Sequence, residues 1–144
     1  MKQGSNPDLE ALRMEIADLH KVFINAHLHK DVDFFVQDLS KDYLSVSGGE
    51  IREPTVDEIR SRFSSYLNNT TFTEYRNLRE PIIGLSKDGS IAWLIAQVKV
   101  AGKRKMEEGV EVELDFICAW ITLFERQGDK WLRLGEVSSF KEVD

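Results

Sequence analysis

The sequence predicts an α+β fold in which helices gathered on one face cover a curved antiparallel sheet. Apolar residues in the first part of the chain recur at helical spacing, and the second half alternates between strand-like segments and turns. The last two strands are apolar on both faces, so each face needs a cover. At 144 residues, with 42% hydrophobic and 31% charged residues, the chain is expected to form a single domain, residues 1–144, with residues 1–6 flexible.

Three helices are expected. Asn6-Pro7-Asp8 joins a capping side chain, a proline at the first helical position and an acid near the helix N-terminus. This segment opens an amphipathic helix of about six turns that ends near His29. Residues 31–39 predict a short second helix, and Thr55 with Glu58 forms the capping box of a third.

Strands are expected wherever alternating apolar residues lie between turn signals. They cover residues 42–47, 72–78, 82–86, 90–100, 110–124 and 131–140. Gly48-Gly49, Lys87-Asp88-Gly89 and Gly128-Asp129 provide turns. The basic run Lys103-Arg104-Lys105 is expected to be the solvated tip of a hairpin.

Composition excludes several classes of function. A net charge of −6 argues against nucleic acid or an anionic membrane as the main partner. The single cysteine, Cys118, allows no intrachain disulfide or zinc cluster and is expected to be a small core residue. No segment has the length of a membrane span or the pattern of a signal peptide, so a cytoplasmic protein is expected. No nucleophile triad, phosphate loop or metal signature is present, and we expect no cofactor and no metal.

The three histidines all lie on the first predicted helix. They lack the four-residue spacing with which one helix face holds a metal ion. Exposed positions are expected for His20, His27 and His29, and only His27 is kept as a candidate pocket residue.

Strand parity at the final hairpin sorts side chains into two faces. A short turn at Gly128-Asp129 would set Leu123 opposite Leu132 or Leu134. One face then carries Ile117, Ala119, Ile121, Leu123, Leu132, Leu134, Glu136, Ser138 and Phe140. The other face carries Leu114, Phe116, Cys118, Trp120, Phe124, Trp131 and Val137.

Three segments of the chain, taken in their order and spacing, resemble the motifs of a known family. They are Lys30-Asp31 with Phe34-Phe35, residues 42–49 with Ile51-Arg52, and residues 124–131. In this order they resemble the first helix corner, the first strand with its glycine turn, and the last hairpin of the nuclear transport factor 2-like superfamily. The SnoaL-like and ketosteroid-isomerase-like branches are the most similar. The resemblance implies a cone-shaped half-barrel, three N-terminal helices, a deep pocket between sheet and helices, and a homodimer.

The resemblance also tests one mechanism. Ketosteroid isomerases need a carboxylate base and a tyrosine–acid pair that donates to the enolate. The resemblance places the tyrosine at Phe23, the base at or next to Val46 and the acid at Asp115. Phe23 has no hydroxyl group to donate and Val46 cannot accept a proton, so this mechanism is not expected. Since the family's penultimate-strand acid points inward, the resemblance favours the face of Asp115 and Glu136 as the concave one.

On that face Asp115 and Glu136 are the candidate catalytic residues. Glu136 would lie among apolar side chains, where desolvation raises the pKa of a carboxyl group toward the range useful for acid–base chemistry. Alternatively, Glu136 pairs with Arg13, Arg79 or Arg133, or it reaches water at the pocket mouth. The expected ligand-binding residues are Phe23, His27, Tyr43, Trp93, Ile117, Ile121, Leu134 and Phe140.

The opposite, convex face would expose several hundred Å² of apolar surface. A homodimer through this face is therefore expected, with Phe116, Trp120, Phe124 and Trp131 at the interface. The favoured function is the binding of a small apolar or amphipathic molecule. The alternatives are an acid–base enzyme (an isomerase, cyclase or dehydratase) and a structural dimerisation domain.

Overall fold

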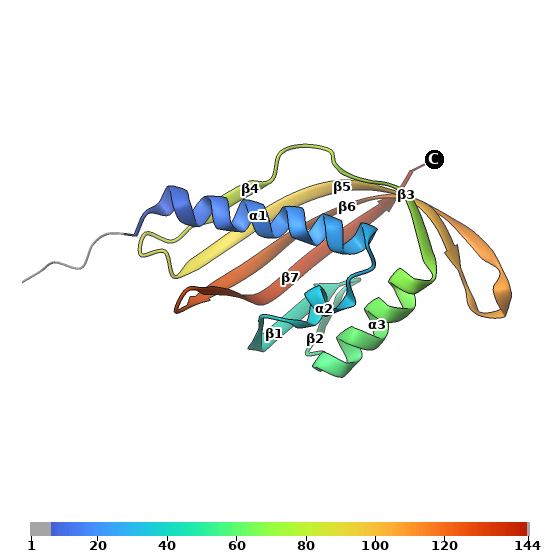
Figure 1. Cartoon of the computed structure of the whole chain (residues 1–144), viewed down its shortest axis with the longest axis horizontal. Helices are drawn as coiled ribbons and strands as arrows, with labels where there is room; N and C mark the ends of the chain where they lie inside the picture. Colours follow the sequence, from blue (N-terminus) through green and yellow to red (C-terminus); the bar gives the residue numbers. More distant parts are fainter. Residues whose placement is uncertain (1–6, 144) are drawn as a thin grey trace, which may run out of the picture.

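Helix α1 (Leu9–Leu28) lies lengthwise across one face of a curved sheet, and α2 (Val32–Val36) and α3 (Val56–Asn68) lie near the far end of α1 (Figure 1). The computed structural model describes residues 7–143. Within these residues, the seven strands are β1 (Leu39–Ser47), β2 (Glu50–Arg52), β3 (Thr70–Asn77), β4 (Ile82–Leu85), β5 (Ile91–Lys105), β6 (Glu111–Gln127) and β7 (Lys130–Glu142). A 3₁₀ turn, η1 (Glu107–Gly109), lies between β5 and β6. The predicted α+β class is confirmed.

The start of α1 differs from the prediction. The N-cap is Asp8, whose carboxylate accepts a hydrogen bond from the Ala11 backbone N–H at 3.1 Å. Pro7 therefore precedes the helix instead of opening it. The predicted cap Asn6 and the expected flexibility of residues 1–6 fall outside the described residues.

Helix α3 begins as predicted, with a reciprocal capping box. The Thr55 hydroxyl accepts from the Glu58 N–H and the Glu58 carboxylate accepts from the Thr55 N–H, both at 3.1 Å. Helix α2 is shorter than the predicted residues 31–39. It ends because Gln37 is extended (φ −85°, ψ 155°) and Asp38 has a φ of 55°, so the chain turns directly into β1.

The strands form one open sheet in the order β2-β1-β7-β6-β5-β3, with β4 paired to the first part of β5. Strands β1 and β7 run parallel, whereas the other pairs are antiparallel, so the sheet is mixed. The predicted turn at Gly128-Asp129 joins β6 to β7. Strand β5 continues past its predicted end at Val100 to Lys105, so the basic run lies within the sheet.

A β-bulge at Leu134 sets the facing of β7. The pairs on its two sides are Leu123 with Gly135 and Phe124 with Arg133. Leu134 is left as the extra residue, and the strand's alternation shifts by one position there. Both Arg133 and Glu136 consequently line space between the sheet and the helices. The regular pairing predicted for Leu123 is therefore wrong. The predicted alternation of β6 agrees with the structure, but after the bulge Glu136, Ser138 and Phe140 are on the face predicted for Val137, and Val137 is on the other.

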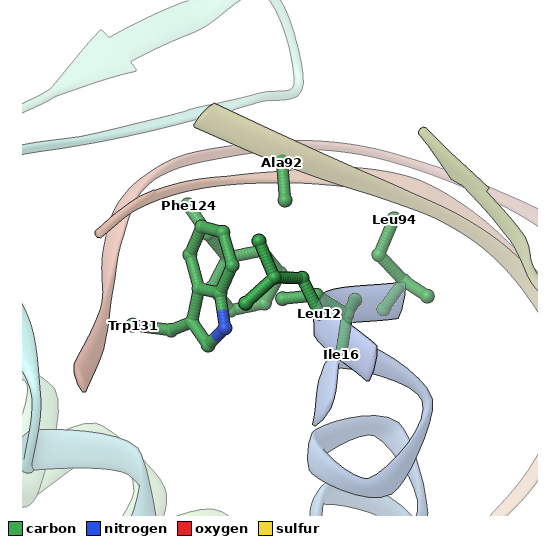
Figure 2. Packing of buried hydrophobic residues seen from close by; sticks show 6 residues of the cluster. All are labelled: Leu12, Ile16, Ala92, Leu94, Phe124 and Trp131. Atoms are coloured by element: carbon green, nitrogen blue, oxygen red, sulfur yellow. The ribbon is translucent and has the colours of Figure 1, made fainter. Parts of the chain in front are cut away.

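The aromatic residues predicted on the convex face lie against the helices instead. Trp120, Phe124 and Trp131 are 6%, 5% and 7% exposed, and Phe116 lines a cavity described below. Figure 2 shows the first core cluster, made of Leu12, Ile16, Ala92, Leu94, Phe124 and Trp131 from α1, β5, β6 and β7. A side chain buried in the core of one subunit cannot contact another subunit, so Trp120, Phe124 and Trp131 cannot form the predicted interface. Phe116 is only partly buried.

The outer face of the sheet carries the opposite side chains. Its cross-strand neighbours Trp93, Ile121, Leu123 and Val137, here called the outer apolar patch, are 36%, 38%, 39% and 49% exposed. Trp93 lies over Gly84 of β4, where any side chain would collide with the indole ring. Within residues 7–143, no helix is both long and apolar enough to cross a membrane.

Candidate functional site

Two cavities lie between the helices and the inner face of the sheet. The main cavity has a volume of about 480 Å³ and extends between α3 and the far ends of β5, β6 and β7. The side cavity has a volume of about 240 Å³ and lies between α1, α2 and the β6–β7 hairpin. Four side chains line both spaces and form the wall between them: Phe23, Trp120, Arg133 and Glu136.

Aromatic rings form a large part of the wall of the main cavity. They come from all three α-helices and from the sheet, and include Phe23, Phe35, Phe63, Tyr66, Tyr75 and Trp120. Phe140 stands at the end of β7 with 63% of its surface exposed and contacts Phe116 with a centroid distance of 5.7 Å. Five of the predicted catalytic and ligand-binding residues meet in this cavity: Phe23, His27, Tyr43, Glu136 and Phe140.

Glu136 places a carboxyl group in the common wall of the two cavities. Its side chain is 25% exposed, and its nearest cation is Arg133, with Nη1 3.7 Å from Oε1. Burial raises the pKa of Glu136, and the Arg133 guanidinium and the nearby Tyr43 hydroxyl oppose this shift only in part. The pairing of Glu136 with Arg133 was one of the three arginine alternatives read from the sequence.

Arg133 is occupied mainly by the backbone of α2 and the turn after it. Its Nη2 donates to the carbonyl oxygens of Phe34 at 3.1 Å and Gln37 at 3.2 Å, and its guanidinium lies 5.5 Å from the centre of the Phe34 ring. These contacts pin the α2–β1 corner to β7. Because its donors are shared in this way, Arg133 neutralises Glu136 less completely than a dedicated bidentate partner would.

His27 is buried, in contrast to its predicted exposure. It is 4% exposed, and its ring stacks on Tyr75 with a centroid distance of 4.4 Å. Nδ1 lies 3.0 Å from the Phe23 carbonyl oxygen, which can only accept, so Nδ1 carries the proton. Nε2 therefore faces the Tyr75 hydroxyl, 3.5 Å away, as an acceptor. Desolvation lowers the pKa of His27 to about 4, and the ring is neutral at pH 7.

His20 was also predicted to be exposed, and this prediction is wrong because its side chain is buried, with 2% of its surface exposed. Its Nε2 lies 2.7 Å from the Asn77 side-chain oxygen on β3. Burial lowers the pKa of His20 more than this hydrogen bond raises it. Both histidines are buried because the sheet curves around α1 and covers a wider face of the helix than the leucine stripe alone marks.

Tyr43 and Cys118 complete the surroundings of Glu136. Tyr43 shares its face of β1 with Ser45 and Ser47, and all three line the main cavity. Burial and the neighbouring Glu136 charge raise the pKa of Tyr43 above its usual value. Burial likewise raises the pKa of the Cys118 thiol to about 12, so this cysteine is a protonated core residue. Val46 alternates with these residues and is absent from the cavity wall.

The second predicted catalytic residue, Asp115, lies apart from the cavities. It is exposed and pairs with Lys99 on the neighbouring strand. Trp93, Ile117 and Ile121 share the outer parity of their strands, so these three predicted ligand-binding residues face away from the helices. Leu134, the extra residue of the bulge, lines neither cavity.

Two arginines that line the main cavity were not predicted as site residues from the sequence. Arg104 continues the inward alternation of Ala96, Val98 and Val100 along β5, but the strand was predicted to end before it. Arg62 belongs to the inward face of α3 with Ile59, Phe63 and Tyr66, a helical spacing that the sequence did display. Among the described residues, no group of three or more histidine, cysteine or acidic side chains is arranged to hold a metal ion.

Comparisons with known proteins identify the fold. No family model matches the sequence, and no curated protein matches it. A nuclear transport factor 2-like protein from Cytophaga hutchinsonii is 18% identical with a TM-score of 0.68, over 88% of this chain and 96% of its own. A candidate calcium/calmodulin-dependent kinase II association domain from Exiguobacterium sibiricum is 10% identical with a TM-score of 0.68, over 98% and 100%. A candidate ketosteroid isomerase from Shewanella frigidimarina is 18% identical with a TM-score of 0.62, over 85% and 92%.

The chain thus has the nuclear transport factor 2-like fold that the sequence resemblance implied. At identities below 20% the likeness carries the architecture and no particular activity. Any function must therefore be argued from the cavity itself.

Proposed function

We propose that the main cavity binds a small amphipathic organic molecule. One observation carries the proposal: a space of about 480 Å³, within the range of small-molecule sites, walled by aromatic rings from the helices and the sheet. A few polar side chains interrupt the apolar wall and would orient a ligand, among them Glu136, Tyr43 and Arg104.

Native mass spectrometry of the protein as purified tests whether a molecule is bound, and a discrete added mass would give its identity. Titration with phenylnaphthylamine, a neutral fluorophore that brightens in apolar surroundings, tests the cavity directly. Ser45→Phe would place a ring in the main cavity from β1, and we expect it to weaken binding at least about tenfold. Ser61→Phe, on the exposed side of α3, is the matched control and should bind as the wild type does.

Two results would overturn the proposal. If Ser45→Phe and Ser61→Phe bind the fluorophore equally well, the binding site is not the main cavity. If the wild type binds no fluorophore and carries no added mass, the chain is better described as a structural dimerisation domain.

A second candidate function is acid–base catalysis by Glu136, of the isomerase, cyclase or dehydratase kind. The observation that favours it is a carboxyl group of raised pKa in the cavity wall, next to the Tyr43 hydroxyl. Once a bound molecule is identified, Glu136→Gln should still bind it but lose about 10²–10⁴-fold in turnover. Unchanged turnover by this variant would rule the acid–base role out.

A further inference from the structure

We propose that the ligand of the main cavity is an organic anion with an apolar body, and that Arg62 and Arg104 bind its charged group. This inference rests on the proposed binding function and adds the chemical class of the ligand. It follows from two arginines that line the cavity and form no salt bridge among the described residues.

Arg104 has an unused hydrogen-bond donor inside the protein. Its Nε is buried and has no hydrogen-bond partner among the described residues. Its guanidinium lies 5.2 Å from the centre of the Tyr66 ring, and this contact holds the group against the cavity wall. An unpartnered buried donor on a charged group is costly, so an acceptor supplied by a ligand would stabilise the site.

Arg62 approaches the same place from α3. It lies one helical turn before Tyr66, the residue whose ring Arg104 contacts, and Arg62 and Arg104 both line the main cavity. Arg62 is exposed and lines the cavity, which places it toward the solvent. Arg60, two residues away on the same helix, has Asp33 at 2.7 Å, whereas Arg62 forms no salt bridge among the described residues. Its charge acts at longer range on the exposed Glu58, one helical turn before it.

The charge of the cavity wall differs from that of the whole chain. The chain carries a net charge of −6, but the charged side chains lining the main cavity are Arg62, Arg104, Arg133 and a single acid, Glu136. The wall is therefore cationic in an acidic protein. Such a wall attracts anions, and apolar surroundings strengthen the attraction.

Two fluorophores that differ by one charged group test this inference. Phenylnaphthylamine is neutral, and anilinonaphthalene sulfonate carries a sulfonate on the same ring system. We expect the wild type to bind the sulfonate more tightly than the neutral compound, with an affinity that falls as salt is added. Arg104→Gln and Arg62→Gln should each weaken sulfonate binding about tenfold and leave the affinity for the neutral compound unchanged.

Arg79→Gln is the matched control because Arg79 is exposed, lines neither cavity and has no salt bridge among the described residues. Its loss changes the net charge equally and should change neither affinity. The inference is overturned if the cavity variants bind the sulfonate as Arg79→Gln does, or if both fluorophores weaken together. In either case, if the wild type binds the neutral fluorophore, the proposed binding function is still supported. If the wild type binds neither fluorophore, both proposals are wrong. Arg62 is exposed, so its variant remains informative even if Arg104→Gln folds poorly.

Discussion

Burial shifts the pKa values of two groups in the main cavity in opposite directions. The pKa of the Glu136 carboxyl is raised, and the pKa of the His27 imidazole is lowered to about 4. Desolvation is the largest cause in both cases, because it disfavours whichever form carries charge. The two groups therefore make opposite contributions to the pH dependence of stability.

For His27 the expected effect is a loss of stability in acid. The folded pKa of about 4 lies below the ordinary value of 6.5, so the unfolded chain takes up the proton first as the pH falls. The contribution of neutral His27 to the free energy of unfolding is present above pH 6.5 and is lost as the pH falls toward 4. The loss is about 2–3 kcal/mol at pH 4.5. His27→Phe keeps a ring beside Tyr75 and should lose that much less between pH 7 and pH 4.5 in urea unfolding. Identical losses in the two proteins would show that His27 does not titrate in this range.

For Glu136 the sign is reversed. Its folded pKa lies above the ordinary value of 4.5, so ionisation favours the unfolded chain as the pH rises through the interval between the two. Glu136→Gln should therefore gain stability relative to the wild type as the pH rises from 4.5 to 8. Chemical denaturation at several pH values measures this, with Glu113→Gln, an exposed position of β6, as the control. A difference between variant and wild type that is constant across these pH values would contradict the raised pKa.

At the scale of elements, the α2–β1 corner is held to the sheet by one side chain. Arg133 donates to two backbone carbonyl oxygens there, while its own side chain is only 11% exposed. Arg133→Gln should cost about 2–3 kcal/mol, because hydrogen bonds from a charged donor are lost inside the protein. Arg60→Gln removes the exposed pair between Arg60 of α3 and Asp33 of α2 and should cost less than about 1 kcal/mol. Equal costs in urea unfolding would mean that the corner does not depend on Arg133.

Local signals in the sequence predicted the elements well. The capping box at Thr55 and the turn at Gly128-Asp129 involve neighbouring residues only, so they could be recognised without knowledge of the packing. The N-cap of α1 was predicted wrongly, two residues before Asp8, because Asn6 and Asp8 are both suitable caps. The end of β5 was missed because a basic run at Lys103–Lys105 looks like a loop when its strand partner is unknown.

Side-chain direction in β7 depends on distant residues, and here the prediction failed. Leu132 and Leu134 alternate regularly with Arg133, and the only local sign of the bulge at Leu134 is the glycine that follows it. That glycine also allows a close approach to β1, since at Gly135 a Cβ would come within 3.1 Å of the Leu44 carbonyl oxygen. Glu136 was placed among apolar side chains as the structure has it, but its predicted neighbours belonged to the wrong face.

At the scale of the whole molecule, the outer apolar patch is the surface through which we propose that two copies associate. Its four side chains are each at least 36% exposed and adjacent across three strands. An apolar group of this kind on an open sheet face is typical of interaction surfaces. The homodimer expected from the sequence is thus retained as a proposal, with a different set of residues.

Ile121→Lys places a charge in the middle of this patch and should convert a dimer into monomers or cause aggregation. Native mass spectrometry or light scattering at micromolar concentration measures the result. Met14→Lys, at a 61% exposed position of α1, is the control and should leave the assembly unchanged. A wild type that is monomeric under these conditions would refute the dimer.

The bulge at Leu134 also bears on how this gene can tolerate small deletions. Loss of the Leu134 codon would leave Arg133, Gly135 and Glu136 in plain alternation, so the cavity wall would keep the same inward side chains. Loss of the Val137 codon, only three positions later, would turn Ser138 and Phe140 to the opposite face of the strand. Among related genes, we therefore expect deletions within the cavity-lining part of this strand to concentrate at the bulge. A deletion there leaves the same side chains facing the cavity.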